Sequence, residues 1–569
     1  MAANDQQVLM LILQAAHAEY PEQSKADFFE QFCAEQVLKD YDLSVEDIQR
    51  GIVDGEHDGG ADSVYAFVNG ELIPEDNFDL LPFKKDVSIE LHIIQSKSAN
   101  GFSEGTIDKL SSLATALLKI NADYDAIPQY NEAVKSVMNG FREVYTKLVN
   151  KFPSLTINYY YAAQKADQHV HQNTQIKAES LKALTSDLFP EATVNFSFIA
   201  APKLVELARR KPRTTFSLKT NKIVGSGRGY VSLVTLSAYN AFLRDDHGKL
   251  NRELFESNVR DFQGSTEVND DIMATLNGTS QVDFWEMNNG VTILSSKAIL
   301  NGDTVIIENP QIVNGLQTSS QIASYFDGGA LTDTRQVMIK VVAFDDEETR
   351  DKIIKATNFQ NRVAPASLRA TDKVQRDIEE ALRASGLFYD RRKNFYKNLG
   401  KPAVKIISIP LLAQATMSLI LARPDNARAR PSSLLKDDDT YASVFSDKIP
   451  VGAYVKAAML LQRVDAELRT YPGMIRRERT NIRFFVLYWL GAEQTRRPNP
   501  SAAHLEKVDV DKITGADVHQ AIKTVSGLYH QVGASDQAAK GTALRDRVVD
   551  EIKAAIIDKI NQDKDAKSD

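Results

Sequence analysis

Two strand patterns that follow a glycine-rich acidic turn limit what the first part of the chain can fold into. The turn covers 54–62, and Ser63–Val68 directly after it has the composition of a strand. Val87–Gln95 alternates apolar and polar residues, the period of two of a half-buried strand. Helical patterns at 8–19, 25–39, 104–120, 130–150 and 174–187, and a further strand pattern at 155–163, surround them. We therefore expect a mixed α/β domain over residues 1–200.

The rest of the chain divides by composition and pattern into three stretches. Residues 203–228 hold eight basic side chains and one acidic one, and we expect 201–229 to be a basic linker. Strand patterns, Phe284–Met287 among them, alternate with helical ones over 230–449, which predicts a second α/β domain. The pattern from 450 to 569 is helical. The expected fold class is a multidomain α/β protein with a helical C-terminal region.

Charge and cysteine content restrict the class of protein. A single cysteine in 569 residues, Cys33, excludes an intrachain disulfide and a cysteine-rich zinc site. No stretch approaches the ~20 apolar residues of a membrane span, so we expect a cytoplasmic protein with no membrane partner. The net charge of -8 argues against nucleic acid, but residues 1–100 alone hold 20 acidic and 6 basic side chains. The remaining chain is net basic, so a nucleic-acid partner is not excluded.

The end of the second strand carries a candidate catalytic site. Gln95 and Lys97 are two residues apart and share a face of the predicted sheet. Asp62 stands at the start of the neighbouring strand, where a hairpin-like return would bring its carboxylate beside them. Oxygen ligands of this kind suit Mg²⁺ (or Mn²⁺), and a nearby ammonium suits phosphodiester hydrolysis. We expect Asp62 and Gln95 to bind the metal and Glu30 to complete the site, with Glu35 as the alternative.

The same residues resemble a nuclease superfamily. Gly59-Gly60-Ala61-Asp62 and Gln95-Ser96-Lys97 are similar to the motifs of the Mrr-like members of the PD-(D/E)xK nucleases, over roughly residues 24–200. The resemblance implies a restriction-endonuclease-like α/β domain. Glutamine stands at 95 where glutamate is the commonest residue of that family, and the lost charge weakens metal binding. A surface turn beside a solvated strand end is the structural alternative.

Clusters of asparagine and glutamine mark the middle of the chain. Asn289-Gly290 between two strand patterns predicts a hairpin, and Asn314-Gly315 precedes a helix near Gln317. A third cluster contains Asn361. These amides either bind a ligand such as a nucleic acid or satisfy buried backbone groups. We name Asn289, Asn314, Gln317 and Asn361 as candidate nucleic-acid-binding residues.

These clusters carry a second resemblance, to the AIPR family, named for abortive infection and phage resistance. The matching segments, in order, are Phe255–Arg260, Phe284–Ile293, Glu308–Thr318, Ala356–Val363 and Asp372. The resemblance covers about residues 230–430 and implies a bacterial anti-phage protein. An N-terminal Mrr-like nuclease segment is a recurring arrangement in that family.

A basic and aromatic segment lies further along the chain. Arg391, Arg392 and Lys393 precede Phe395 and Tyr396, a combination suited to phosphate contacts and base stacking. We expect these three cations to bind nucleic acid, with a solvated loop as the alternative.

Together, the metal-site pattern and the two resemblances imply a Mg²⁺-dependent defence nuclease that cuts DNA, with the AIPR region binding nucleic acid or sensing infection. Such an enzyme needs control, so we expect a phage-derived trigger or a homo-oligomer. A non-catalytic binding or assembly protein with a degenerate nuclease fold, and an effector that cleaves RNA, are the alternatives.

Overall fold

The order of strands and helices along the chain is that of separate α/β and helical regions. The computed structural model describes residues 2–20, 23–41, 43–53, 55–74, 87–98, 101–124, 126–164, 170–210, 214–226, 228–245, 248, 250–255, 267–278, 283–330, 332–344, 349, 353, 372–391, 394–398, 400–429 and 433–565. The chain forms two compact units, one mainly from residues 1–368 and the other mainly from 369–569.

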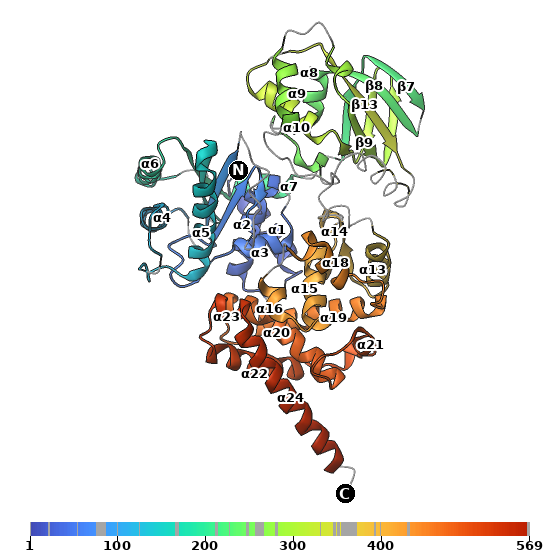
Figure 1. The fold of residues 1–569 in the computed structure, drawn as a ribbon. Helices are drawn as coiled ribbons and strands as arrows, with labels where there is room; N and C mark the ends of the chain where they lie inside the picture. The colour runs from blue at the N-terminus through green and yellow to red at the C-terminus, as the bar shows by residue number, and fades with distance from the viewer. Residues whose placement is uncertain are drawn as a thin grey trace. The chain divides into compact units, whose positions relative to one another are not determined.

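A five-stranded sheet carries the N-terminal α/β region (Figure 1). Its strand order is β2-β1-β3-β4-β5; β1 is antiparallel to β2 and β3, whereas β4 and β5 run parallel to β3. The region contains α1 (Ala2–His17), α2 (Lys25–Val37), η1 (Lys39–Tyr41), α3 (Val45–Gly51), β1 (Ser63–Val68), β2 (Glu71–Leu72), β3 (Ser88–Lys97), α4 (Glu104–Leu117), α5 (Glu132–Leu148), η2 (Val149–Lys151), β4 (Ser154–Ala163), α6 (Gln172–Leu188), β5 (Thr193–Ala200) and α7 (Ala201–Arg209). The mixed α/β prediction for this region is confirmed.

The central strand β3 is buried on both faces, so the prediction of a half-buried strand is wrong here. Leu91 and Ile93 pack in one core with α4, α5 and α6. Ile94 packs in a second core on the opposite face, with residues of α2 and α3. His92 lies on that second face at 2% exposure and stacks on the ring of Tyr160. His92 is covered because helices pack on both sides of the sheet, whereas Ser88 and Glu90 at the start of the strand stay partly exposed.

The central region holds two sheets. A five-stranded sheet has the order β12-β9-β13-β8-β7, and a three-stranded one the order β10-β11-β6. The elements are β6 (Thr215–Lys219), β7 (Lys222–Ser226), β8 (Gly229–Thr235), α8 (Leu236–Leu243), η3 (Arg252–Phe255), α9 (Glu267–Asn277), η4 (Phe284–Glu286), β9 (Val291–Ser295), β10 (Lys297–Asn301), β11 (Thr304–Glu308), β12 (Gln311–Asn314), α10 (Leu316–Asp327) and β13 (Gln336–Ala343). Their apolar sides share one core, and Figure 1 shows α8, α9 and α10 grouped beside the five-stranded sheet.

Two local predictions in this part of the chain are wrong. The segment 201–229, expected to be a basic linker, contains α7 and the strands β6 and β7. Strand β6 pairs with β11, and β7 pairs with β8, so backbone pairing decides the conformation of this basic segment. Phe284–Glu286 is a short 3₁₀ helix instead of a strand, so Asn289-Gly290 does not join two strands of a hairpin.

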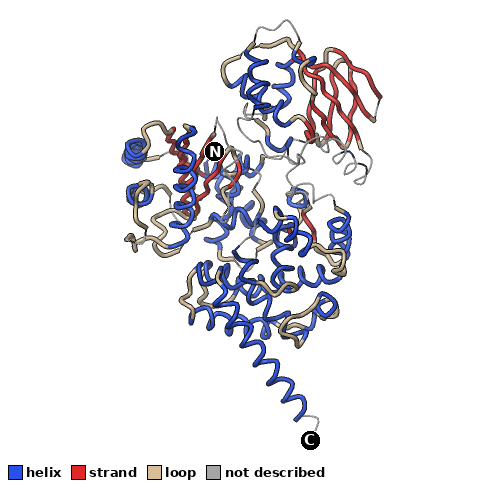
Figure 2. Tube along the Cα trace, in the orientation of Figure 1, coloured by secondary structure: helices blue, strands red, loops and turns tan. Residues whose placement is uncertain are grey.

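The second compact unit is mainly helical and begins well before residue 450. It contains α13 (Lys373–Ala384), β14 (Phe388–Asp390), α14 (Phe395–Asn398), η5 (Ala403–Lys405), β15 (Ile406–Ser408), α15 (Ile409–Leu419), α16 (Pro424–Ala429), α17 (Ser433–Lys436), α18 (Asp438–Val444), α19 (Val451–Thr470), α20 (Arg476–Thr495), α21 (Ala502–Leu505), η6 (Val510–Lys512), α22 (Gly515–Gln531), α23 (Asp536–Lys540) and α24 (Thr542–Asp565). In Figure 2 the chain from α13 onward is almost wholly helix and loop.

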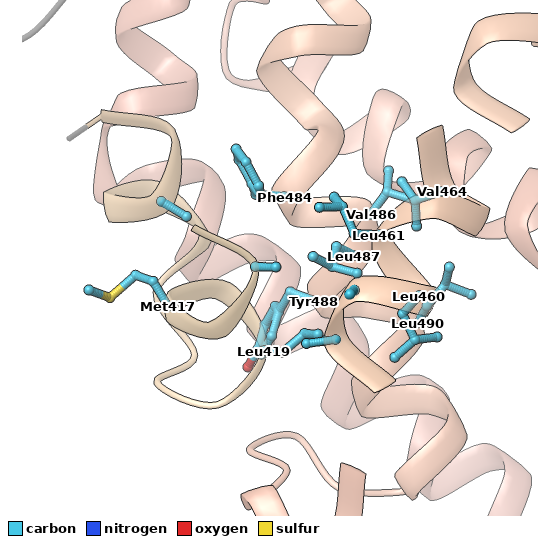
Figure 3. Packing of buried hydrophobic residues seen from close by; sticks show 14 of the residues in the cluster. Met417, Leu419, Leu460, Leu461, Val464, Phe484, Val486, Leu487, Tyr488 and Leu490 are labelled. Atoms are coloured by element: carbon cyan, nitrogen blue, oxygen red, sulfur yellow. The ribbon is translucent and has the colours of Figure 1, made fainter. Parts of the chain in front are cut away.

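One hydrophobic core joins the helices on both sides of residue 450 in that unit. It includes Leu419 of α15, Leu460 of α19 and Leu487 of α20, which are labelled among the packed side chains in Figure 3. Helix α20 begins with a basic turn and continues as a buried segment, in which Arg483 pairs with Asp465. The residues 372–449 therefore pack with the C-terminal helices, because their short apolar helices complete this core. Among the described helices, none combines the length and apolar character needed to cross a bilayer.

Candidate functional site

Asp62 and Gln95, the two predicted metal ligands, are in direct contact. Ser63 pairs with Ile94 in the antiparallel β1–β3 ladder, so the residues on either side, Asp62 and Gln95, meet at the end of the sheet. Gln95 Nε2 donates to Asp62 Oδ2 at 2.6 Å. Asp62 is 3% exposed and Gln95 1%. The expectation that the strand order brings these two side chains together is confirmed.

Ser96 fixes the same carboxylate oxygen, a contact that sequence reasoning missed. Its backbone N–H and its hydroxyl donate to Asp62 Oδ2 at 2.6 and 2.7 Å. With the Gln95 amide, three donors converge on one oxygen and hold the carboxylate in place. Ser96 lies between Gln95 and Lys97, and strict strand alternation assigns it to the other face of the sheet. Nearly every residue has a backbone N–H, so the identity of residue 96 could have indicated only the hydroxyl contact.

The Gly59-Gly60 turn brings helix α4 against the site. Both glycines have a positive φ, 72° and 82°, which residues with a side chain rarely adopt. A Cβ at Gly60 would lie 2.9 Å from Cβ of Lys109 on α4 and 3.5 Å from Oε1 of Gln95. Lys109 is exposed, and its side chain runs alongside this turn. It is a second cation next to the site, and the sequence provides no motif that singles it out.

Helix α2 contributes Glu30 and Cys33 near the same carboxylate. Cys33 is fully buried, and burial raises the pKa of its thiol well above the usual value. The negative charges of Asp62 and Glu30 raise this pKa further, so both carboxylates lie within electrostatic range of the thiol. Glu35, the alternative acid, accepts a hydrogen bond from Gln31 at 3.0 Å. Of the two acids, Glu30 is the one whose charge, like that of Asp62, acts on the Cys33 thiol.

Lys97 ends β3 and lies two residues beyond Gln95. It is half-buried, and no ion pair joins its ammonium to another described residue. The backbone carbonyl of Lys97 accepts from the N–H of Gln164 at 3.0 Å, which holds the strand end against β4. A lysine at a strand end that has no ion pair with the described residues is suited to an incoming phosphate.

The oxygen-bearing side chains at this site suit a hard cation such as Mg²⁺, provided that the ion takes only a few ligands from the protein. Among the described residues no three His, Cys, Asp or Glu side chains converge as a metal cluster. Mg²⁺ in enzymes is commonly held by one or two carboxylates, with water and phosphate oxygens completing its shell. Asp62 is a carboxylate of this kind, and Glu30 of α2 is the candidate for a second. Gln95 now presents its amide nitrogen to Asp62, so the amide has to turn over before its oxygen could join Asp62 as a ligand.

Two asparagines of the central region, Asn288 and Asn314, lie at the same end of its five-stranded sheet. Asn288 Nδ2 donates to Thr318 Oγ1 at 3.2 Å, and Asn288 Oδ1 accepts from the N–H of Gly290 at 2.9 Å. Asn314 ends β12 beside Thr292, directly before α10, as expected from the Asn-Gly turn. These contacts tie the segment before β9 to the first turn of α10.

The other predicted carboxamide residues have different surroundings. Asn289 is exposed. Gln317 is half-buried, and its Oε1 is buried with no hydrogen-bond partner among the described residues. Asn361 lies outside the described residues.

Arg391 has a structural role instead of the predicted contact with nucleic acid. Its side chain is 4% exposed, and its Nε donates to Glu379 Oε2 at 2.6 Å. Tyr396 donates its hydroxyl to the other oxygen of Glu379 at 2.7 Å. A buried, paired guanidinium offers no charge to a phosphate backbone. Arg392 and Lys393 lie outside the described residues.

Comparison with known proteins identifies part of the chain. The family model described as AIPR protein matches residues 255–538, from the central region through most of the helical unit. The match extends further towards the C-terminus than the resemblance over 230–430, and the sheet that carries Asp62 lies outside it. No curated protein and no solved structure matches the chain. Residues 255–538 therefore belong to the AIPR family.

Proposed function

We propose that this chain is an anti-phage defence protein whose N-terminal region is a Mg²⁺-dependent nuclease acting on DNA. Membership of residues 255–538 in the AIPR family supports the defence role. The observation that carries the nuclease is the Asp62 carboxylate, fixed by Gln95 and Ser96 at the end of β3, with Lys97 two residues further on. The topology around it, with β1 antiparallel and β4 parallel to β3, is in keeping with the resemblance to the PD-(D/E)xK nucleases.

Each residue has a defined task in this proposal. Asp62 and Glu30 would hold the cation, and Ser96 keeps the Asp62 carboxylate oriented. Bound Mg²⁺ supplies a Lewis acid that lowers the pKa of water and polarises the phosphate. Lys97 stabilises the negative charge that develops on the phosphate oxygens. Water adds to phosphorus, the bond to the leaving oxygen breaks, and a proton from water ends on that oxygen.

A second candidate is a non-catalytic binding protein with a degenerate nuclease fold. The hydrogen bond from Gln95 to Asp62 favours it, because the amide nitrogen satisfies the carboxylate without a metal ion. An effector that cleaves RNA is a third candidate, since the same metal chemistry acts on both nucleic acids.

Cleavage assays separate these candidates. Purified protein is incubated with plasmid DNA, single-stranded DNA or RNA in Mg²⁺, Mn²⁺ or EDTA. We expect metal-dependent cleavage of DNA, and a loss of about 10²-fold or more in Asp62→Ala and Lys97→Ala. Asp187→Ala and Lys182→Ala on α6 are matched controls, because they change the same charges on the surface. Equal cleavage by wild type and both site variants would refute the assignment.

A phage-plating assay addresses the binding candidate. If cells carrying the wild-type chain resist phage and the purified protein cleaves none of the substrates, the non-catalytic candidate is favoured. Loss of protection in Asp62→Ala, with protein levels unchanged, favours the nuclease.

A further inference from the structure

One face of the five-stranded sheet of the central region is open to solvent over part of its width. Val337, Ile339 and Ile293 point to the opposite face and pack with α8 and α10. The registers place one continuous row of side chains across all five strands on the outer face. This row is Val224 (β7), Val231 (β8), Lys340 (β13), Thr292 (β9) and Asn314 (β12).

The neighbouring row adds a second lysine. Lys222 pairs with Leu233, and Leu233 pairs with Met338. Lys222 and Lys340 are exposed, and neither forms an ion pair with another described residue. Val224 is 78% exposed and Val231 47%, so nothing in the described chain covers this part of the sheet. We call these two rows the outer face.

Among the residues that the structure describes, no carboxylate pairs with the lysines of the outer face. None of the five strands contains an aspartate or glutamate. The three-stranded sheet next along the chain differs, because Lys297 on its β10 pairs with Glu308 on β11. The third row of the five-stranded sheet is also different, because Leu294 there is fully buried in a small cluster with Val313 and Phe344. The open surface is thus limited to the two rows that carry the lysines.

We propose that the outer face binds the sugar–phosphate backbone of a nucleic acid. Lys222 and Lys340 would each neutralise a phosphate, with Thr292 and Asn314 beside them as hydrogen-bonding side chains. The absence of carboxylates from these strands removes the repulsion that a mixed surface would exert on a polyanion. This inference rests on the proposed function only in that the chain acts on nucleic acid. Lys222 lies in the basic segment 201–229, which the sequence predicts to be a linker and which forms β7 at this point.

Binding is measured in EDTA, where metal-dependent cleavage does not occur. A failure of the binding proposal can then be distinguished from a failure of the nuclease proposal. Fluorescence anisotropy of labelled 30-nucleotide single-stranded and duplex DNA is recorded in EDTA over a range of KCl concentrations. In Lys222→Ala/Lys340→Ala we expect weaker binding, by roughly tenfold at moderate salt. We also expect the slope of log K against log[salt] to fall by about two, because two phosphates are no longer neutralised by a lysine.

The control variant removes the same number of positive charges from the three-stranded sheet. Lys219→Ala/Lys297→Ala removes two lysines from β6 and β10, and we expect its affinity and salt slope to match wild type. An unchanged affinity in Lys222→Ala/Lys340→Ala, an equal loss in the control, or no binding by wild type would overturn the inference. Binding that depends on Lys222 and Lys340 in a protein without Asp62-dependent cleavage supports the inference and refutes the nuclease.

Discussion

Gln95 donates its side-chain N–H to Asp62 Oδ2 at 2.6 Å, so the two residues that the sequence suggests as metal ligands hold each other. Both are buried, and the carboxylate also receives two donors from Ser96. The site is therefore organised before any cation arrives. As a consequence, the amide nitrogen of Gln95, and not its oxygen, faces the Asp62 carboxylate.

Gln95→Glu exchanges the donor for a second carboxylate beside Asp62. Without metal the two charges repel each other and Asp62 loses a hydrogen bond. We therefore expect a lower melting temperature and a loss of about 1–3 kcal/mol in the free energy of unfolding. Mg²⁺ binds only the folded site and therefore stabilises the folded state. The effect should be larger in this variant than in wild type, because the variant has a second carboxylate beside Asp62. Differential scanning fluorimetry with Mg²⁺ and with EDTA measures both effects.

Gln375→Glu is the matched control for that experiment. Gln375 is also fully buried, and its amide contacts two tyrosine hydroxyls in the helical unit. We expect it to be destabilised to the same extent with and without Mg²⁺. A Gln95→Glu protein that Mg²⁺ stabilises no more than wild type would contradict a metal site at Asp62.

Gly60→Ala should destabilise the N-terminal region by about 1–3 kcal/mol, since alanine is strained at φ +82° and its Cβ would press on Lys109. Gly140→Ala in α5 is the control. Nothing lies within 4 Å of a Cβ there, and alanine favours helix over glycine by up to about 1 kcal/mol. Urea unfolding followed by circular dichroism should show opposite shifts of the midpoint, and shifts of the same sign would contradict the turn geometry.

Cys33 should make stability fall as pH rises above about 8.5, the pKa of an exposed thiol. Burial and the charges of Asp62 and Glu30 raise the pKa of this thiol in the folded state. The folded state therefore keeps a proton that the unfolded state loses, and the stability gained from Cys33 disappears between the two pKa values. In Cys33→Ala we expect a flatter dependence of the melting temperature on pH between about 8 and 10. Parallel curves for the two proteins would rule out this linkage.

Arg391→Ala should destabilise the helical unit by about 3–5 kcal/mol, because it leaves the Glu379 carboxylate buried without its cation. Arg383 also approaches Glu379, at 3.6 Å, but its side chain is 63% exposed. For Arg383→Ala we expect a loss of no more than about 1 kcal/mol. Thermal unfolding compares the two. Equal small losses would show that Arg391 is not a structural residue and would reopen its role in binding nucleic acid.

The N-terminal fold could be predicted because its signals are local. Period-two strands, helical patterns and the Gly59-Gly60 turn are each recognisable within a short stretch of sequence. Asp62 and Gln95 meet because the two strands that they flank pair in an antiparallel ladder. The hydrogen bond from Ser96 N–H to Asp62 could not be predicted, because the donor is a backbone group. Nor could the position of Lys109, since a helix reaches the turn only after the sheet has formed.

Local sequence was enough to place Asp62, Gln95 and Lys97 at neighbouring strand ends, because alternation and strand order are properties of short stretches of chain. The surroundings of the charged residues depend instead on tertiary packing. Strand β6 pairs with β11, some ninety residues later, so the basic segment became sheet and not linker. Arg391 is buried because Glu379 lies opposite it on another element. Charge is visible along a sequence, but the partner that buries or exposes it is chosen by packing between distant segments.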